Sequence, residues 1–233
     1  MLGAIIVDPG HGGKDPGAST KKNINGKNVS IIEKDIVLDV SKELFRKLKR
    51  TFPDKQLIMT RAGDTYPSLK ERSDKANAVP LKQNEAIIFV SVHANSSTNK
   101  DANGFEVWYL DPNVRRDVLD KKIINEPNEV IPIINDMLQE QFTTESILLS
   151  QMIAGEFQNT FGNSLPLRGI LSKDWYVVKN SRMPAVLVEL GFISNEKDAF
   201  LMLNQSQKFA DAIFKGINDF VTRFESSEGF TAR

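Results

Sequence analysis

The 233-residue sequence contains no cysteine and only two histidines. The absence of cysteine excludes a disulfide framework and any metal site built from thiolates. Lysine plus arginine and aspartate plus glutamate number 30 each, so no net charge favours nucleic acid or an anionic membrane as a partner. No apolar run approaches the ~20 residues of a membrane-spanning helix, and no transmembrane segment is expected. The length predicts one α/β domain.

Apolar runs of strand length alternate along the chain with stretches of helical spacing, whereas residues 14–28 form a polar stretch. This alternation predicts a single doubly wound α/β domain over residues 1–224, with a flexible tail at 225–233. Strands are predicted at 4–8, 56–60, 86–92, 105–110, 176–178 and 185–189, with 105–110 at an edge of the sheet. Helices are predicted at 32–50, 68–77, 145–161, 195–203 and 208–224.

Three of the apolar runs lead into a side chain that can bind a metal or transfer a proton. His11 follows the run 4–8 within a Pro-Gly-His-Gly-Gly loop, His93 closes the run 86–92, and Glu189 ends the run 184–188. Ligands of α/β sheets bind in the crevice outside the carboxyl ends of the strands. We therefore expect the three side chains to share one site. Glu189 in particular needs a partner or a shifted pKa, because its apolar neighbours predict that it is buried.

Glu33 is the carboxylate that we expect to join the two histidines. It opens the first helix, whose amino terminus faces the same sheet edge as the end of the preceding strand. Catalytic zinc sites typically use three protein ligands chosen from His, Asp and Glu. Ser30 and Glu33 also fit a capping box, so the pattern alone leaves ligation and capping open. His93 taken alone is also explained as a buried histidine bonded to backbone.

Four segments occur in this order along the chain: residues 8–13 (DPGHGG), 33–35 (EKD), 91–95 (SVHAN) and 184–195 (PAVLVELGFISN). Together they resemble the zinc-dependent N-acetylmuramoyl-L-alanine amidases of the amidase-3 type, which are bacterial cell-wall hydrolases. The resemblance implies a mixed, mostly parallel twisted sheet with helices on both faces. It implies one zinc ion with His11, Glu33 and His93 as ligands and Glu189 as the catalytic glutamate, and it favours ligation over capping at Glu33.

The substrate that the resemblance implies is peptidoglycan, cleaved at the amide between N-acetylmuramic acid and the L-alanine of the stem peptide. Two other classes stay open, a zinc carboxypeptidase-like peptidase and a non-catalytic peptidoglycan-binding relative. Asn95 and Arg168 are candidates for positioning the substrate, although loop capping and surface charge explain them equally well. Such a substrate implies export to the periplasm or cell wall, although Met1-Leu2-Gly3 leads directly into the first strand without a signal peptide.

Residues 111–144 form a charged, proline-containing insertion after the fourth predicted strand. Some cell-division amidases of this family carry an inserted inhibitory helix at this point, which predicts autoinhibition and an activator protein that relieves it. A surface helix without a regulatory role explains the segment equally well. Its apolar residues Val130, Ile131, Ile133, Ile134, Met137 and Leu138 are candidate docking contacts, and Glu126, Glu129 and Glu140 are candidate blocking carboxylates.

Overall fold

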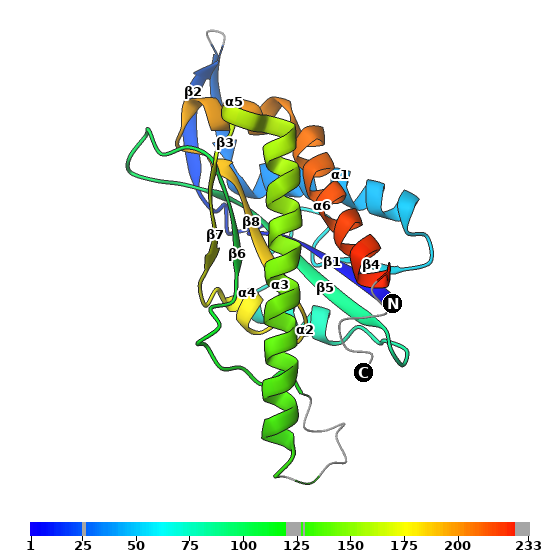
Figure 1. Cartoon of the computed structure of the whole chain (residues 1–233). Coiled ribbons are helices and arrows are strands. Elements are labelled where there is room, and N and C mark those ends of the chain that lie inside the picture. Colours follow the sequence, from blue (N-terminus) through cyan, green and yellow to red (C-terminus); the bar gives the residue numbers. More distant parts are fainter. Residues whose placement is uncertain (25–26, 120–126, 128, 227–233) are drawn as a thin grey trace.

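A six-stranded sheet runs through the centre of the computed structural model, which describes residues 1–24, 27–119, 127 and 129–226 (Figure 1). The strand order is β4-β1-β5-β8-β6-β7. β1 (Leu2–Pro9), β4 (Gln56–Met59), β5 (Ala86–Asn95) and β8 (Ala185–Phe192) are parallel. β6 (Phe105–Tyr109) pairs antiparallel with β8 and parallel with β7 (Leu167–Ser172). The predicted fold class, a mixed and mostly parallel sheet with helices on both faces, is confirmed.

The two faces of the sheet carry separate apolar cores. α1 (Glu33–Thr51), α3 (Ile131–Phe161) and α6 (Ser206–Ser226) pack on one face, and α2 (Leu69–Asn77) and the short α4 (Tyr176–Lys179) pack on the other (Figure 1). Side chains of β5 alternate between these cores, with Val90 and Val92 in the first and Phe89 in the second. His93 therefore points to the face that carries α2 and α4.

Three strands and one short helix differ from the sequence prediction. An antiparallel hairpin of β2 (Ser19–Ile24) and β3 (Lys27–Ile32) begins within the polar stretch, extends beyond it and forms its own two-stranded sheet. β7 was not predicted, and because it pairs with β6, the prediction that 105–110 is an edge strand is wrong. Residues 176–178 form α4 rather than a strand, since a buried Val177-Val178 pair suits either structure.

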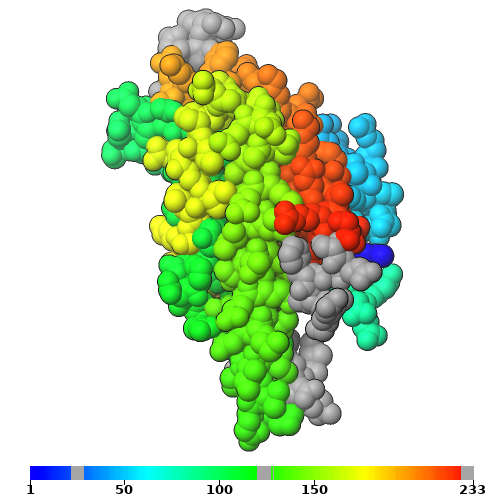
Figure 2. Space-filling view, viewed as in Figure 1, coloured from blue at the N-terminus to red at the C-terminus, as the bar shows by residue number. Residues whose placement is uncertain are grey.

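α3 begins at Ile131, earlier than the predicted start at residue 145. Pro132 lies in the first turn of α3, where a backbone N–H would have no acceptor within the helix. A proline is therefore favourable at this position and does not end the helix. Figure 2 shows α3 in green as a continuous ridge beside α6. Before this helix, the buried guanidinium of Arg116 donates to the carbonyls of Val178 (2.8 Å) and Ser181 (2.6 Å), which fastens the insertion to the body.

The end of α6 reaches the start of the sheet. α6 includes Glu225 and Ser226, the first two residues of the predicted tail, while residues 227–233 lie outside the described residues. The Glu225 carboxylate accepts hydrogen bonds from the amide of Leu2 (3.0 Å) and from Lys55 (2.8 Å). α5 (Glu196–Asn204) links β8 to α6. None of the helices in the described ranges is long and apolar enough to cross a membrane.

Candidate active site

The structure brings His11, Glu33 and His93 to one point at the carboxyl edge of β1 and β5. Oε1 of Glu33 lies 3.0 Å from Nε2 of His11 and 3.1 Å from Nδ1 of His93. The three candidate ligand atoms all lie within 4.8 Å of one another, and within the described ranges no other three metal-competent side chains meet in this way. The histidine side chains are 24% and 18% exposed, so the point is open to solvent on one side.

Two glycines let the loops approach this point closely. A Cβ on Gly10 would lie 2.3 Å from the imidazole of His93, and a Cβ on Gly17 would lie 2.5 Å from the carboxylate of Glu33. Gly17 also has φ +65°, a conformation that side chains disfavour. His11 itself has φ +57°, which is uncommon outside glycine and indicates that its surroundings hold the loop in place.

Two buried arginines hold that loop. Arg72 of α2 donates to the carboxylate of Asp8 (2.8 Å) and to the carbonyl of Pro9 (2.6 Å). Arg61 donates to the carbonyls of Pro9 (3.0 Å) and Gly10 (2.7 Å). These contacts join residues more than 50 positions apart, so the sequence had no local signal for them. They fix the backbone that carries His11.

Glu33 is the first residue of α1 and does not cap it. The cap residue is Ile32, which makes no side-chain cap hydrogen bond, so the capping-box alternative is wrong. The Glu33 carboxylate instead accepts the amides of Ala18 (2.8 Å) and Ala94 (3.1 Å) in addition to its contacts with the histidines. Burial acts to raise its pKa, but the hydrogen bonds from His11 and His93 outweigh burial and hold the pKa below its usual value.

Asp15 orients His11. Its Oδ2 lies 2.9 Å from Nδ1 of His11, and its Oδ1 accepts the amide of Gly17 at 3.0 Å. Nδ1 faces this carboxylate and Nε2 faces Glu33. Burial lowers the pKa of His11, yet Glu33 and Asp15 together raise it above its ordinary value. A carboxylate behind a metal-binding histidine fixes the tautomer and orientation of the ring. Asp15 was not predicted from the sequence, although its place four residues after His11 in the same loop was a usable signal.

Three side chains from neighbouring strands form what we call the polar row: His93, Glu189 and Glu106. His93 and Glu189 are partners in the pairing of β5 with β8, and Glu189 and Glu106 are partners in that of β8 with β6. Glu189 is 9% exposed, and its Oε2 is buried with no hydrogen-bond partner among the described residues. Burial raises its pKa well above the ordinary value, and the charges of Glu33 and Glu106 add to this rise.

Glu106 closes the row and was not singled out by the sequence. Its Oε2 accepts hydrogen bonds from the side chains of Asn95 (3.0 Å) and Trp108 (3.1 Å), and its Oε1 accepts one from Arg168 (2.7 Å). Both candidate positioning residues, Asn95 and Arg168, therefore converge on this carboxylate. Unlike Glu189, Glu106 has partners for both oxygens, so it suits a supporting role rather than proton transfer.

A cavity of about 220 Å³ opens over the two histidines on the face that carries α2 and α4. His11, His93 and Arg72 line it, together with Tyr66 and Leu69. No described residue of the insertion 111–144 lines this cavity, and α3 packs on the opposite face of the sheet. The site can thus hold a cation between two imidazoles and a carboxylate, beside Glu189, one buried oxygen of which has no partner in the described part of the chain.

A model of the amidase-3 family, described as N-acetylmuramoyl-L-alanine amidase, matches residues 5–219. The chain belongs to this family. The chain is 33% identical over 220 residues to the uncharacterised protein YqiI of Bacillus subtilis. The aligned region covers 93% of this chain and 84% of that protein. The chain is also 30% identical over 235 residues to the probable N-acetylmuramoyl-L-alanine amidase AmiB of Haemophilus influenzae. That match covers 91% of this chain but 51% of AmiB, so the chain spans about half of that relative.

The fold of this amidase-family chain is similar to that of a solved amidase. The N-acetylmuramoyl-L-alanine amidase AmiC2 of Nostoc punctiforme superposes with a TM-score of 0.69 at 27% sequence identity. The superposition covers 95% of this chain and 98% of that one. The family predicted from four short segments is confirmed.

Proposed function

We propose that the chain is a zinc-dependent hydrolase that cleaves the amide between N-acetylmuramic acid and the L-alanine of peptidoglycan stem peptides. In this proposal His11, Glu33 and His93 hold one zinc ion and Glu189 is the general base. One observation carries it: three donor atoms meet at one point beside a strand neighbour, Glu189, whose buried Oε2 has no partner in the described part of the chain.

The donor set fits zinc. Imidazole nitrogens and a carboxylate are the ligands of catalytic zinc sites, with bonds of about 2.0–2.2 Å, which places neighbouring ligand atoms of a tetrahedron about 3.4 Å apart. The distances of 3.0 and 3.1 Å from Glu33 to His11 and His93 are close to this value. Because Asp15 faces Nδ1 of His11, Nε2 of that ring is the atom presented to the cation.

The side chains of the polar row suit hydrolysis of an amide. Bound zinc supplies Lewis acidity, which polarises a carbonyl and lowers the pKa of water. Glu189 accepts the proton of the attacking water at its unpartnered oxygen and returns it to the nitrogen of the leaving amine. A divalent cation beside Glu189 would oppose the rise in pKa that burial causes. Glu106, held by Asn95 and Arg168, supports the row without transferring a proton.

The metal assignment is tested by metal content and peptide release. Wild-type protein should release stem peptides from purified sacculi and stop doing so when a chelator is added. His11→Ala and His93→Ala should retain no zinc after dialysis, because two ligands make an incomplete site. Stoichiometric zinc in either variant, measured by mass spectrometry, would contradict the assignment. Release that a chelator does not affect would contradict the requirement for metal.

The general base is tested by Glu189→Gln. This variant should keep its fold and its zinc but lose roughly 10²- to 10⁴-fold in rate, the usual cost of losing a general base. Glu33→Gln is the matched control and should lose zinc. If Glu189→Gln loses zinc while Glu33→Gln keeps it, the roles of the two glutamates are exchanged. Zinc-loaded wild-type protein that binds sacculi without releasing peptides would support the non-catalytic alternative, and release of single terminal amino acids would support the carboxypeptidase-like alternative.

The proposed substrate lies outside the cytoplasmic membrane, so we place the action of the protein in the periplasm or cell wall. Autoinhibition by residues 111–144 and an activator that relieves it stay predictions. Glu126 lies outside the described residues, and Glu140 is exposed on α3 and does not line the cavity. Ile133 and Met137, which are 61% and 66% exposed on the first half of α3, are the side chains available to such an activator.

A further inference from the structure

Large apolar side chains are exposed around the mouth of the metal cavity. Tyr66 and Leu69 line the cavity and are 42% and 51% exposed. Tyr176 is 43% exposed and immediately precedes Val177, which also lines the cavity. We call Tyr66, Leu69 and Tyr176 the apolar rim. Exposed apolar groups that gather at a cavity mark a binding surface, because folding alone would bury them.

An aromatic surface continues from the rim to the polar row. Trp175, which precedes Tyr176, packs edge-on against Trp108 with ring centroids 5.9 Å apart. The indole N–H of Trp108 donates to Glu106 of the row. The indole nitrogen of Trp175 is buried and has no hydrogen-bond partner within the described ranges. These are the two tryptophans of the chain, and both lie on this side of the site.

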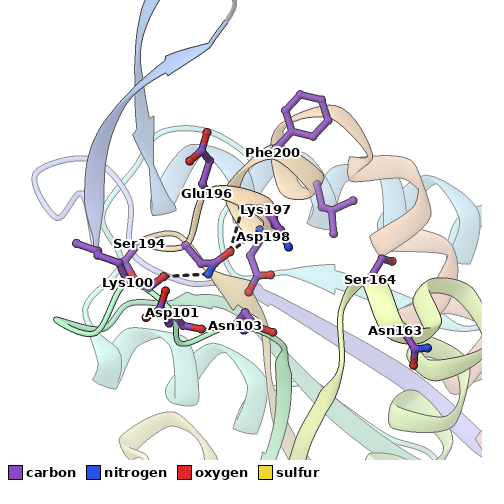
Figure 3. A pocket seen from close by; sticks show the side chains of 12 residues that line it. Lys100, Asp101, Asn103, Asn163, Ser164, Ser194, Glu196, Lys197, Asp198 and Phe200 are labelled. Atoms are coloured by element: carbon purple, nitrogen blue, oxygen red, sulfur yellow. Dashed lines mark hydrogen bonds between the residues drawn. The ribbon is translucent and has the colours of Figure 1, made fainter.

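Glu106, the end of the polar row away from His93, contacts a charged group as well as Trp108. Arg168, whose side chain is 42% exposed, donates to Glu106 and reaches the carbonyl of Asn103 at 3.5 Å. Asn103 lines a groove of about 1040 Å³ whose charged residues have both signs: Lys100, Lys197, Asp101, Glu196 and Asp198 (Figure 3). The apolar rim therefore lies at the His93 end of the row, and this polar groove lies beyond Glu106.

We propose that the apolar rim binds the sugar of the substrate. This inference rests on the proposed function, whose scissile amide joins a sugar to a peptide. Pyranose rings present C–H faces that pack on aromatic rings, and their hydroxyls suit phenol and indole groups at the edges. The ammonium group of Lys14 lies 4.7 Å from the ring centre of Tyr66, but Tyr66 is still 42% exposed and so remains available to a sugar.

Binding of sugar alone tests the inference without any hydrolysis. The probe is a peptide-free oligosaccharide of alternating N-acetylglucosamine and N-acetylmuramic acid, titrated into the full chain by calorimetry and by tryptophan fluorescence. Tyr66→Ala and Tyr176→Ala should each weaken binding roughly three- to tenfold, as expected for loss of one aromatic packing partner. Phe200→Ala is the matched control, since Phe200 is 49% exposed but lines the polar groove. It should bind the oligosaccharide as the wild type does.

Unchanged binding in both rim variants would overturn the inference, as would an equal loss in Phe200→Ala. Absence of oligosaccharide binding by the wild-type chain would also overturn it. A chain that binds the oligosaccharide through the rim but releases no stem peptides would retain the inference and refute the proposed hydrolysis. A chain that releases stem peptides with rim variants as active as the wild type, at limiting substrate, would keep the proposed function and refute the sugar assignment.

Discussion

At His11, neighbouring side chains determine which ring nitrogen faces Glu33 and the proposed metal site. Asp15 lies on the Nδ1 side at 2.9 Å, Glu33 lies on the Nε2 side at 3.0 Å, and two buried arginines hold the preceding carbonyls. Contacts within the protein thus orient the ring. Preorganisation of this kind reduces the ordering that binding must cause. It also makes the residue behind the ring a determinant of affinity.

We therefore expect Asp15→Asn to lower zinc affinity about 10- to 100-fold, the usual effect of removing a carboxylate that orients a ligand histidine. Competition with a chromogenic chelator measures the change. Asp74→Asn is the control, because Asp74 is an exposed carboxylate paired with Lys70 on α2 and should leave affinity unchanged. Equal zinc affinity in Asp15→Asn and the wild type would show that the ring is oriented by other contacts.

At the scale of elements, α3 and α6 cross at a glycine. A Cβ at Gly216 of α6 would lie 2.5 Å from Cα of Ile153 on α3, a distance that requires the helices to move apart. Gly155 of α3 has no atom within 4 Å of its Cβ position. The same substitution at these two positions separates the packing effect from helix propensity.

Gly216→Ala should destabilise the protein by about 1–3 kcal/mol, as overpacking does. Gly155→Ala should stabilise it by up to about 1 kcal/mol, because alanine favours the helix and nothing obstructs its methyl group. Urea denaturation of both variants measures the two changes. A stabilised Gly216→Ala would mean that α6 can shift away from α3 at little cost.

The elements also show how far the sequence could predict the structure. β1, β5 and β8 are buried apolar runs, and that pattern predicted them as strands. The mixed, mostly parallel sheet was implied by the family resemblance, and the strand order was not predicted. The hairpin β2–β3 was not predicted, because β2 is mostly polar and only the end of β3, at Ile31, enters the core. The early start of α3 was missed because Pro132 in its first turn resembled a break.

Some residues of the candidate site could likewise be predicted from the sequence, and others could not. Each metal-competent residue ends or begins a recognisable run, so His11, Glu33, His93 and Glu189 were predicted, with the family resemblance deciding Glu33. The arginines were not, since Arg61 and Arg72 act on carbonyls far away in the sequence. Glu106 was missed because its strand looked like an amphipathic edge, where a glutamate faces water.

At the scale of the whole molecule, Glu145 makes stability depend on pH. It is 2% exposed, on the face of α3 that packs on the body, and accepts one hydrogen bond from Gln141 at 2.8 Å. Burial raises its pKa because the charged form loses water, and the bond from Gln141 only partly opposes this. The folded protein therefore holds this proton to a higher pH than the unfolded chain. The group stabilises the fold below its unfolded pKa and loses that contribution as the pH rises through its folded pKa.

Glu145→Gln removes the ionisation and can keep the contact with Gln141. We expect the variant to be more stable than the wild type at about pH 8, with the difference shrinking toward about pH 4, where the wild-type acid is protonated. Free energies of unfolding from urea titrations at several pH values measure this trend. Glu140→Gln, at an exposed position on the same helix, should show no such trend. A gap between Glu145→Gln and the wild type that stayed constant with pH would assign the effect to packing.

The hairpin β2–β3 lies between the proposed ligands His11 and Glu33 in the sequence, yet the two side chains are neighbours in space. At its base Ser19 pairs with Ile32, the amide of Glu33 donates to the carbonyl of Ala18 at 2.9 Å, and the amide of Ala18 donates back to the Glu33 carboxylate. These bonds at the base of the hairpin keep Glu33 beside His11 whatever the length of the two strands beyond the base. Insertions or deletions in those strands can therefore accumulate in a lineage without moving either ligand. A sequence search that fixes the number of residues between the histidine and the glutamate would miss relatives with longer or shorter hairpins. A structural search for the hydrogen bonds at the hairpin base would find them.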